Sequence, residues 1–586
     1  MSPVREKVPT GRVRVSAALQ AATMLLPARY NYSAYSVLAG PADAPPTEDR
    51  PYTVRMRRLA RRRPVLTVLI TLFAFAFEST FFGWLIASIE IPDRRLDPLL
   101  YGGAIGMIVA TATIELFRLV NVVTLCLATL WARDPVPVVP DTTLRVAFLT
   151  TIVPGKEPVA MVEQTLRAAR NVRYGGTYEV WLLDEGDDAD VKAMCERLGV
   201  RHFSRRGIEK FNTPAGAFKA KTKHGNYNSW VDVHGDDYDV FVSVDPDHVP
   251  LPNFCERLLG YFRDPDVGFV VGPQIYGNYD NLVTRWAESQ QYLFHSLLQR
   301  AGNRRGIAML VGTNNAVRIK ALQSIGGLQD SITEDMATSL ALHAARNPAT
   351  GRNWRSVYTP DVLAVGEGPS SWTDYFTQQH RWSRGTDEVV LRTFARTARR
   401  LGPGRALHYG LLMSYYPLTA LAWLLGAVNA FCYLVLGAQG VHVPQEVWLM
   451  LYIDAAFFQI GLYVFNRRHN TSPHEEAGSS GLTGMVASTL STPIYVSSFV
   501  GALLRRKAGF VVTPKGDSTS PDRLATFAPG LRWAVFFVAM LVVAELTGHV
   551  DNAMFMWPAL NLLICLTPPA LWFVLRRRRR PEESEA

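Results

Sequence analysis

A polar stretch of mixed strand and helix character lies between two blocks of long apolar runs, and this alternation limits the possible folds more than any other feature. The first block holds Pro64–Ile89, with the single charge Glu78, and Leu99–Trp131, with the charges Glu115 and Arg118. Each run is long enough to cross a hydrocarbon core of about 30 Å as a helix. Glu115 and Arg118 share one helical face, so they either form a structural ion pair or mark a pathway through the membrane.

The second apolar block occupies residues 405–575 and contains four further candidate spans. They are Leu407–Leu436, Val447–Phe465, Leu531–Gly548 and Met554–Val574. A fifth run, Leu482–Leu504, is rich in Ser, Thr and Gly. If it also crossed the membrane, the basic run Arg576–Arg580 would face outward, against the preference of Arg and Lys for the cytosolic side. We therefore predict six spans, an interfacial or re-entrant segment at 482–504, and both termini in the cytosol.

Composition and charge agree with a membrane protein. Charged residues make up 19% of the chain, below the roughly 25% of soluble proteins. The net charge of +10 does not indicate a nucleic-acid partner, because Arg and Lys cluster beside the apolar runs, as in Arg55–Arg63. The five cysteines are scattered and show neither zinc spacing nor a disulfide pattern.

The stretch between the blocks, residues 135–400, has the pattern of an α/β domain. Short β-rich runs such as Val146–Val153 and Tyr178–Leu183 alternate with helical stretches such as Val159–Arg170. This alternation predicts a mainly parallel sheet covered by helices, and the two preceding spans (64–131) return it to the cytosol. Residues 1–55 are expected to be a disordered or linker region, and 576–586 a short cytosolic tail.

Acidic clusters follow two of the predicted strands. Asp245 and Asp247 come directly after Val240–Val244, and two carboxylates at i and i+2 can hold one Mg²⁺ or Mn²⁺. Asp184 ends an earlier apolar strand, and Lys223 between the clusters can offer a cation to a phosphate. Taken alone, an acidic pair of this kind is also typical of a solvated turn.

Two further motifs come later in the domain. The first is Thr333, Glu334 and Asp335, in which Asp335 is a candidate general base, although acidic residues are also common at a helix N-terminus. The second lies in a predicted interfacial helix at 371–385. There Gln378, Arg381 and Trp382 share one face, with Arg381 suited to a diphosphate and Trp382 to a sugar ring or a membrane interface.

The order DxD, TED and QxxRW between two membrane blocks resembles the processive family-2 glycosyltransferases: cellulose, chitin and hyaluronan synthases. The resemblance covers roughly residues 60–575 and implies a GT-A catalytic domain, a nucleotide-diphosphate sugar donor, a divalent metal and inversion by single displacement. The roles it implies are metal and UDP binding by Asp245 and Asp247, nucleotide binding by Asp184 and Lys223, base catalysis by Asp335, diphosphate contacts by Gln378 and Arg381, and acceptor stacking by Trp382.

A further match, Phe510–Gly516, resembles the gating loop of bacterial cellulose synthases, which we place at 508–520. By this resemblance Thr513 and Lys515 would close over the donor diphosphate. Three departures stand out: Asp184-Glu185-Gly186 in place of DDG, Pro154-Gly155-Lys156-Glu157 in place of YNE, and only the short tail 576–586 after the last span, so that control by an attached cyclic-di-GMP-binding domain is not expected.

These expectations combine into one hypothesis and two rivals. The chain is expected to be a processive inverting transferase in the cell inner or plasma membrane that polymerises a β-glycan, cellulose-like, from a UDP-sugar and moves the growing polysaccharide across the bilayer. An envelope partner on the exit side is left open. The first rival transfers one sugar to a lipid carrier, and the second is an inactive transporter or scaffold protein.

Overall fold

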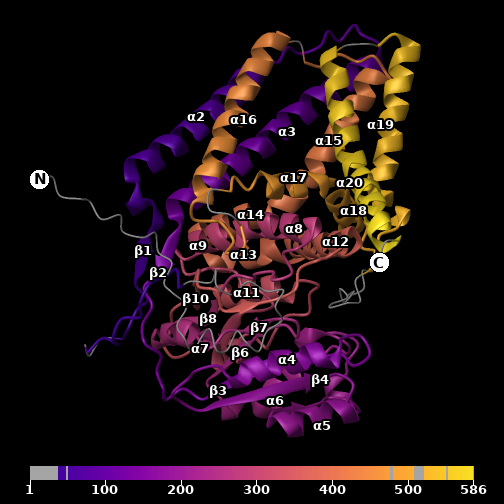
Figure 1. Ribbon diagram of the computed structural model, residues 1–586. Coiled ribbons are helices and arrows are strands. Elements are labelled where there is room, and N and C mark those ends of the chain that lie inside the picture. Colours follow the sequence, from indigo (N-terminus) through magenta and orange to yellow (C-terminus); the bar gives the residue numbers. More distant parts are fainter. Residues whose placement is uncertain are drawn as a thin grey trace, which may run out of the picture.

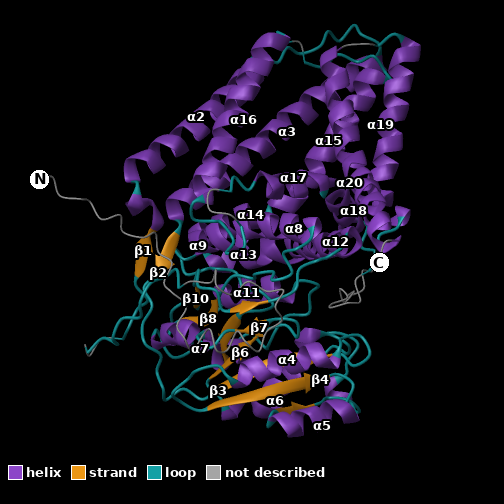
Figure 2. Cartoon of the chain, in the orientation of Figure 1, coloured by secondary structure: helices purple, strands orange, loops and turns teal. Residues whose placement is uncertain are grey.

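The computed structural model describes residues 37–47, 51–441, 443–475, 479–506, 520–549 and 552–584. The chain has two stacked parts: long helices form one, and a sheet with its covering helices forms the other (Figure 1). Figure 2 shows most strands in the second part, with β1 (Met56–Arg58) and β2 (Arg133–Pro135) at the junction of the two parts. The predicted arrangement, a GT-A-type α/β domain inserted between membrane helices, is confirmed.

A seven-stranded sheet is the centre of the α/β domain, with the strand order β10-β8-β9-β6-β3-β4-β5. Its strands are β3 (Val146–Ile152), β4 (Tyr178–Asp184), β5 (Arg201–Phe203), β6 (Val240–Ser243), β8 (Val267–Val271), β9 (Asn315–Arg318) and β10 (Arg355–Tyr358). β9 is antiparallel to both of its neighbours, and the other pairs are parallel. The sheet is therefore mainly parallel, with one reversed strand.

The central strands are apolar on both faces, because each face is covered. Phe148 of β3 points into a core that includes Leu166 of α4 (Val159–Arg170). Its neighbour Leu149 points into the opposite core, with Trp230 of α6 (Lys223–His234). Continuous apolar runs of this kind are typical of strands buried between two layers of helices.

Among the described residues, six helices are long and apolar enough to cross a membrane. They lie in α2 (Pro64–Ala87), α3 (Pro98–Trp131), α15 (Tyr415–Leu434), α16 (Gln445–Arg467), the segment Leu524–Thr547 that contains α19 (Ala528–Thr547), and α20 (Asn552–Ser584), where Phe555–Arg576 meets the criterion. The chain is thus a membrane protein with the predicted two-plus-four arrangement of apolar helices around its α/β domain.

Residues 482–504 form two short helices, α17 (Leu482–Leu490) and α18 (Thr492–Leu503), bent by 47° at Ser491. Such a pair is either a broken span or a re-entrant segment, so the interfacial placement stays a prediction. Pro493 lies in the first turn of α18, where its missing N–H costs no hydrogen bond.

Two boundaries expected from the sequence are wrong. The run 407–436 is not one helix: α14 (Pro403–Met413) ends before α15 begins, because Pro417 has no N–H to offer the carbonyl of Met413. Part of the expected linker 1–55 packs on the catalytic domain, where the Ala39 N–H donates to Asp361 at 2.8 Å and the Val54 N–H to Asp264 at 3.1 Å.

The charges inside the first membrane block are paired. Arg118 Nε lies 2.7 Å from Glu78 Oε1 and 3.4 Å from Glu115 Oε2. Its guanidinium also lies 4.6 Å from the ring centre of Phe81 and 4.4 Å from that of Tyr452 on α16. Of the two expected alternatives, the structure contains the ion pair, and Glu78 is a further partner. The cluster ties α2, α3 and α16 together.

Candidate active site

The carboxyl ends of β3, β4 and β6 meet at one edge of the sheet, where ligands bind in open α/β sheets. Because β9 runs in the opposite direction, its beginning lies at this same edge, beside the end of β6. Ser243 pairs with Asn315 in the ladder, and the Asp245 N–H donates to Thr313 Oγ1 at 3.0 Å. The reversed strand therefore brings residues 312–314 against the acidic loop after β6.

Lys223 is held between two of these loops. Its ammonium group forms an ion pair with Asp245 and donates to the carbonyl of Gly312 at 2.5 Å. Burial alone would lower the pKa of Lys223, but Asp245, Tyr227 and Glu334 outweigh it and raise the pKa above the usual value. Lys223 is therefore a fixed cation at the strand edge, paired with a predicted metal ligand, and its role in nucleotide binding stays a prediction.

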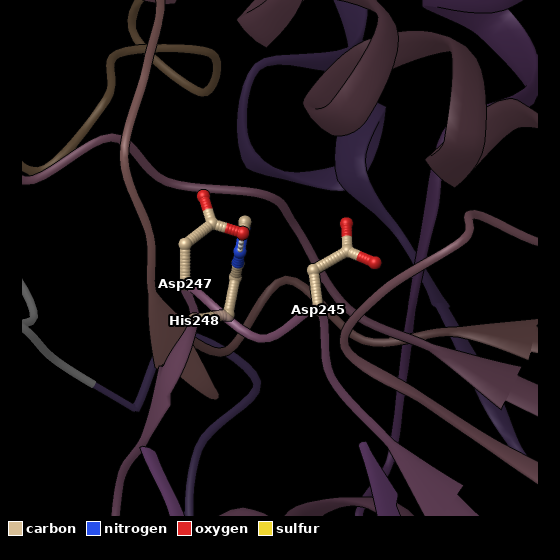
Figure 3. A group of neighbouring side chains, drawn as sticks. All are labelled: Asp245, Asp247 and His248. Atoms are coloured by element: carbon tan, nitrogen blue, oxygen red, sulfur yellow. Dashed lines mark hydrogen bonds and ion pairs between the residues drawn. The ribbon is translucent and has the colours of Figure 1, made fainter. Parts of the chain in front are cut away.

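Asp245, Asp247 and His248 form a set of three potential metal ligands (Figure 3). Their ligand atoms lie within 4.8 Å of one another. Asp247 and His248 are buried, and His248 Nδ1 lies 3.3 Å from Asp247 Oδ1. His248 Nε2 is buried without a hydrogen-bond partner among the described residues. Carboxylates suit Mg²⁺ and Mn²⁺, and an imidazole suits transition metals. These residues therefore fit a divalent metal, and the assignment of Asp245 and Asp247 as its ligands stays a prediction.

His248 was not predicted as a ligand, although it follows the acidic pair in the sequence. Its ring lies flat against Gly366, and a Cβ added there would come within 2.2 Å of His248 Cε1. Gly366 belongs to the loop that β11 (Ala364–Val365) brings against β7 (Val249–Pro250). The sequence could not indicate His248 as a ligand, because Gly366, which makes room for its ring, is far away in sequence and only the fold places the two together.

The Thr333-Glu334-Asp335 motif begins α11 (Glu334–Ala344) and faces the same space. Asp335 Oδ2 accepts from the Gly312 N–H at 3.2 Å, and Oδ1 accepts from the Met336 N–H at 2.7 Å. A Cβ added to Gly312 would lie 3.7 Å from Lys223 Nζ and 3.9 Å from both Asp335 Oδ2 and Glu334 Oε1. Lys223, Glu334 and Asp335 thus converge on Gly312, which leaves room because it has no side chain.

The environment raises the pKa values of both carboxyl groups of this motif. Burial, and next the charge of Asp335, raise the pKa of Glu334 to about 7, while Lys223 and Arg381 oppose the rise. Burial also raises the pKa of Asp335, against the Met336 and Gly312 N–H groups and the same two cations. A carboxyl group whose pKa is shifted toward neutral pH is suited to proton transfer.

The predicted helix at 371–385 is α12 (Trp372–Val389), and it lies between the catalytic edge and the membrane helices. Gln378 is buried and donates from Nε2 to Tyr276 Oη at 3.1 Å. Arg381 is near enough to Glu334 and Asp335 for its charge to lower their pKa values. Trp382, on the same helix face, is half-buried. Arg381 is therefore near the site that Lys223 and Asp335 define, and the roles of Gln378 and Trp382 stay predictions.

Asp184 differs from the other predicted residues, because its carboxylate is fully buried and already used by its own loop. Oδ1 accepts from the Gly186 N–H at 2.8 Å, and Oδ2 accepts from the Asp188 N–H at 2.7 Å. His202 Nε2 lies 3.1 Å from Oδ2. Asp184 shapes the turn after β4, and its role in nucleotide binding stays a prediction. Thr513 and Lys515 lie outside the described residues.

Sequence reasoning missed two acidic side chains at this site. Glu157, in the segment that replaces YNE, accepts from the Val153 N–H at 2.7 Å; burial, Asp247 and Asp245 raise its pKa to about 7. Glu288 of α8 (Leu282–Leu293) is buried behind Tyr276 and accepts from the Tyr276 N–H at 3.3 Å and from Ser472 Oγ at 2.6 Å. Its place could not be found from the sequence, since Ser472 lies beyond the fourth membrane helix.

Two family models match this part of the chain. The model described as glycosyl transferase family 2 matches residues 151–326, and the model described as glycosyl transferase family group 2 matches residues 240–460. The fold and the site thus define a family-2 glycosyltransferase. Within this family the chain is cellulose-synthase-like, as its similarity to curated proteins shows.

Among these proteins is the UDP-forming catalytic subunit of cellulose synthase from Xanthomonas axonopodis pv. citri, 26% identical over 309 residues, which are 51% of this chain and 40% of the relative. A UDP-forming catalytic subunit of cellulose synthase from Dictyostelium discoideum is 31% identical over 33% of this chain and 18% of its own length. A probable glucomannan 4-beta-mannosyltransferase of Arabidopsis thaliana is 35% identical over 35% of this chain and 38% of its own length. The matched segments therefore span less than half of each relative.

Two solved glycosyltransferase structures have lower sequence identity to this chain. A mannosyltransferase from Pyrobaculum calidifontis, determined with GDP-Man and Mn²⁺, is 14% identical; the match covers 69% of this chain and 100% of that one with a TM-score of 0.44. Glucosyl-3-phosphoglycerate synthase from Mycobacterium tuberculosis, with Mn²⁺ and UDP, is 16% identical over 38% of this chain and 72% of its own, with a TM-score of 0.27.

Proposed function

We propose that the chain is a processive inverting glycosyltransferase that polymerises a β-linked glycan from a UDP-sugar and passes the product through its own membrane helices. The observation that carries the proposal is the convergence of Lys223, Glu334 and Asp335 on Gly312, beside the Asp245–Asp247–His248 set and below α12. Transfer of a sugar from its diphosphate requires a cation, a base and a metal site close together, and all three lie at this edge of the sheet.

In this proposal each side chain has a separate task. Asp335 takes the proton of the acceptor hydroxyl as that oxygen attacks the anomeric carbon, and the bond to the diphosphate breaks on the opposite face. A divalent metal held by Asp245, Asp247 and His248 would neutralise the leaving diphosphate. Lys223 shifts from Asp245 toward the same phosphates. Arg381 supplies a planar cation from α12, and Trp382 offers the acceptor sugar a flat apolar surface.

The donor and linkage are inferred from the relatives. The two cellulose synthases are UDP-forming, and the mannosyltransferases are named for a 4-beta linkage. We therefore expect UDP-glucose as donor and a β-1,4-glucan as product. The cytosolic side is where nucleotide sugars are available, which agrees with the orientation that the basic runs predict.

The experiment that tests this function uses the purified full-length protein in detergent with Mg²⁺. Labelled UDP-glucose, UDP-GlcNAc and GDP-mannose are supplied separately, and products are digested with linkage-specific glycosidases. We expect an insoluble polymer from UDP-glucose that a β-1,4-glucanase degrades. A product that carries one sugar on a lipid would instead establish the non-processive alternative.

A variant pair checks the catalytic assignment. Asp335→Asn should lower the rate of transfer by at least about 1,000-fold, because the acceptor hydroxyl loses its base. Asp330→Asn is the matched control, since Asp330 lies in the preceding loop and pairs with Lys219 at 3.0 Å. Equal rates for Asp335→Asn and the wild type would remove Asp335 from the mechanism.

A further inference from the structure

A group of arginines from separate segments meets at the end of the membrane helices that faces the catalytic domain. Aromatic contacts show how α2 and α16 are aligned: Phe77 stacks on Phe458 with ring centres 4.3 Å apart, and Phe81 meets Tyr452 at 6.0 Å. As the residue number rises along α2, that of its partner on α16 falls, so the helices are antiparallel. Followed back to the start of α2, this alignment brings Arg63 to Arg468, directly after the end of α16.

The charges at this corner act on one another. Arg62 and Arg63 add to the effect of burial in lowering the pKa of Arg468. Burial, Arg300, Arg468 and the same two arginines lower the pKa of His469 to about 3. The short sheet of β1 (Met56–Arg58) and β2 (Arg133–Pro135) adds Arg58 opposite Arg133. Burial and the charges of Arg304 and Arg58 lower the pKa of Arg133.

No described carboxylate compensates this group. Nearby, Arg55 pairs with Asp43 and Arg300 with Asp134. In the described parts of the chain, by contrast, no ion pair to an acidic residue involves any member of the corner cluster: Arg58, Arg62, Arg63, Arg133, Arg304 and Arg468. Arg133 Nε is buried without a hydrogen-bond partner among those residues. Like charges brought together without counter-charge destabilise the folded state, unless an anion joins them.

The surroundings identify the anion. Val65, Leu66 and Leu69 of α2 are 70%, 44% and 44% exposed, and Val464 of α16 is 39% exposed. On spanning helices these side chains face acyl chains. Arg468 lies 3.6 Å over the ring centre of Phe465, which holds its guanidinium beside that apolar surface. A ligand here meets hydrocarbon on one side and several guanidinium groups on the other, as a phospholipid does.

We propose that the corner cluster binds the headgroup of an anionic phospholipid in the leaflet on the catalytic side. The preference of basic residues for the cytosolic side explains arginines near helix ends. It does not require arginines of the first helix, of the β1–β2 sheet and of the segment after α16 to gather without acidic partners. Anchoring a lipid between α2 and α16 would brace two helices that are nearly 400 residues apart in sequence.

Lipid binding by the purified full-length protein tests this proposal, with phosphatidylglycerol and phosphatidylcholine titrated separately and bound lipid counted by native mass spectrometry. The wild type should prefer phosphatidylglycerol. Arg62→Gln/Arg63→Gln should weaken its binding by about 30-fold, with a smaller loss for Arg468→Gln. Arg62→Lys/Arg63→Lys, which keeps the charge, should keep most of the preference and shows that the site tolerates substitution.

The control is an adjacent arginine pair at the other end of the same helix, Arg94→Gln/Arg95→Gln, in the exposed loop between α2 and α3. It should bind phosphatidylglycerol as the wild type does. Three results would overturn the proposal: equal binding of the two lipids by the wild type, an unchanged preference in Arg62→Gln/Arg63→Gln, or displacement of phosphatidylglycerol by millimolar inorganic phosphate, which would indicate a site for the free ion.

Discussion

Gly385 of α12 lies directly against Thr333, so close that a Cβ added to the glycine would come within 2.3 Å of Thr333 Cγ2. Thr333 is buried and precedes the candidate base by two residues. The helix that carries Gln378, Arg381 and Trp382 is therefore set against the start of α11 through a glycine. The two motifs are far apart in sequence, and this close contact is one of those that hold them together.

Gly385→Ala should separate the two motifs. The added methyl group must displace either α12 or Thr333, so we expect sugar transfer to fall by about 100-fold, with a smaller change in thermal stability. Gly426→Ala in α15 is the control, because nothing lies within 4 Å of a Cβ there. Initial rates and melting temperatures measured together separate this effect from misfolding. A fully active Gly385→Ala would show that the helices can accommodate the added methyl group, against the prediction.

The metal set gives a second prediction. A chelator should abolish transfer, and Mg²⁺ or Mn²⁺ should restore it. His248→Ala should raise the metal concentration needed for half-maximal activity by at least about 10-fold, because it removes one of the three converging ligands. His234→Gln, on α6 away from the set, should leave that concentration unchanged. An unaltered metal requirement in His248→Ala would exclude the imidazole as a ligand.

The pH dependence of transfer gives a third prediction. Asp335 must be ionised to act as a base, and burial raises its pKa, so the rate should fall as the pH falls through that value. Lys223 and Arg381 oppose the effect of burial and lower the pKa of Asp335. Arg381→Gln removes one of these positive charges and should move the acidic limb of the profile upward by about one pH unit. Glu256→Gln, exposed and paired with Arg173, should not move it.

The raised pKa of Glu288 gives a fourth prediction, on how the free energy of unfolding depends on pH. Burial raises its pKa from 4.5 to about 8, although hydrogen bonds from Ser472 and Gln291 oppose the rise. The folded state therefore holds a proton that the unfolded state releases, and stability falls as the pH rises from about 4.5 to 8. Glu288→Gln should flatten this part of the curve of melting temperature against pH. Glu196→Gln, on an exposed face, should retain the slope of the wild type.

Much of the site could be predicted because its residues lie at the ends of recognisable elements. The apolar run before Asp245 is a buried strand, and Asp335 lies in the first turn of a helix, as their sequence context indicated. The roles assigned to both came from the resemblance to family-2 glycosyltransferases. The helical face of Gln378, Arg381 and Trp382 followed from spacing in the same way. Parallel strands then place their carboxyl ends at one edge, which explains why separate motifs meet there.

What the sequence did not indicate depends on contacts between distant segments. Gly366 makes room for His248, Gly312 for Lys223 and Asp335, and Gly385 for Thr333. A glycine in a single sequence gives no sign of which neighbour needs its space. Nothing near Glu288 in the sequence points to Ser472, its hydrogen-bond partner. The direction of β9 brings Gly312 to the edge of the sheet where the site lies, and that direction is a property of the whole sheet.

The position of α12 also bears on how the chain can be divided. Ser383 Oγ donates to Ser498 Oγ at 2.7 Å, Arg384 binds the carbonyl of Ser498 at 3.4 Å, and Tyr495 Oη donates to Gln379 at 2.9 Å. A fragment that ends near residue 400 would keep α12 but lose α18, and these buried polar groups would be left without partners. We therefore expect the catalytic domain and the second helical block to fold together, and truncation at the apparent domain boundary should yield insoluble protein rather than a soluble enzyme.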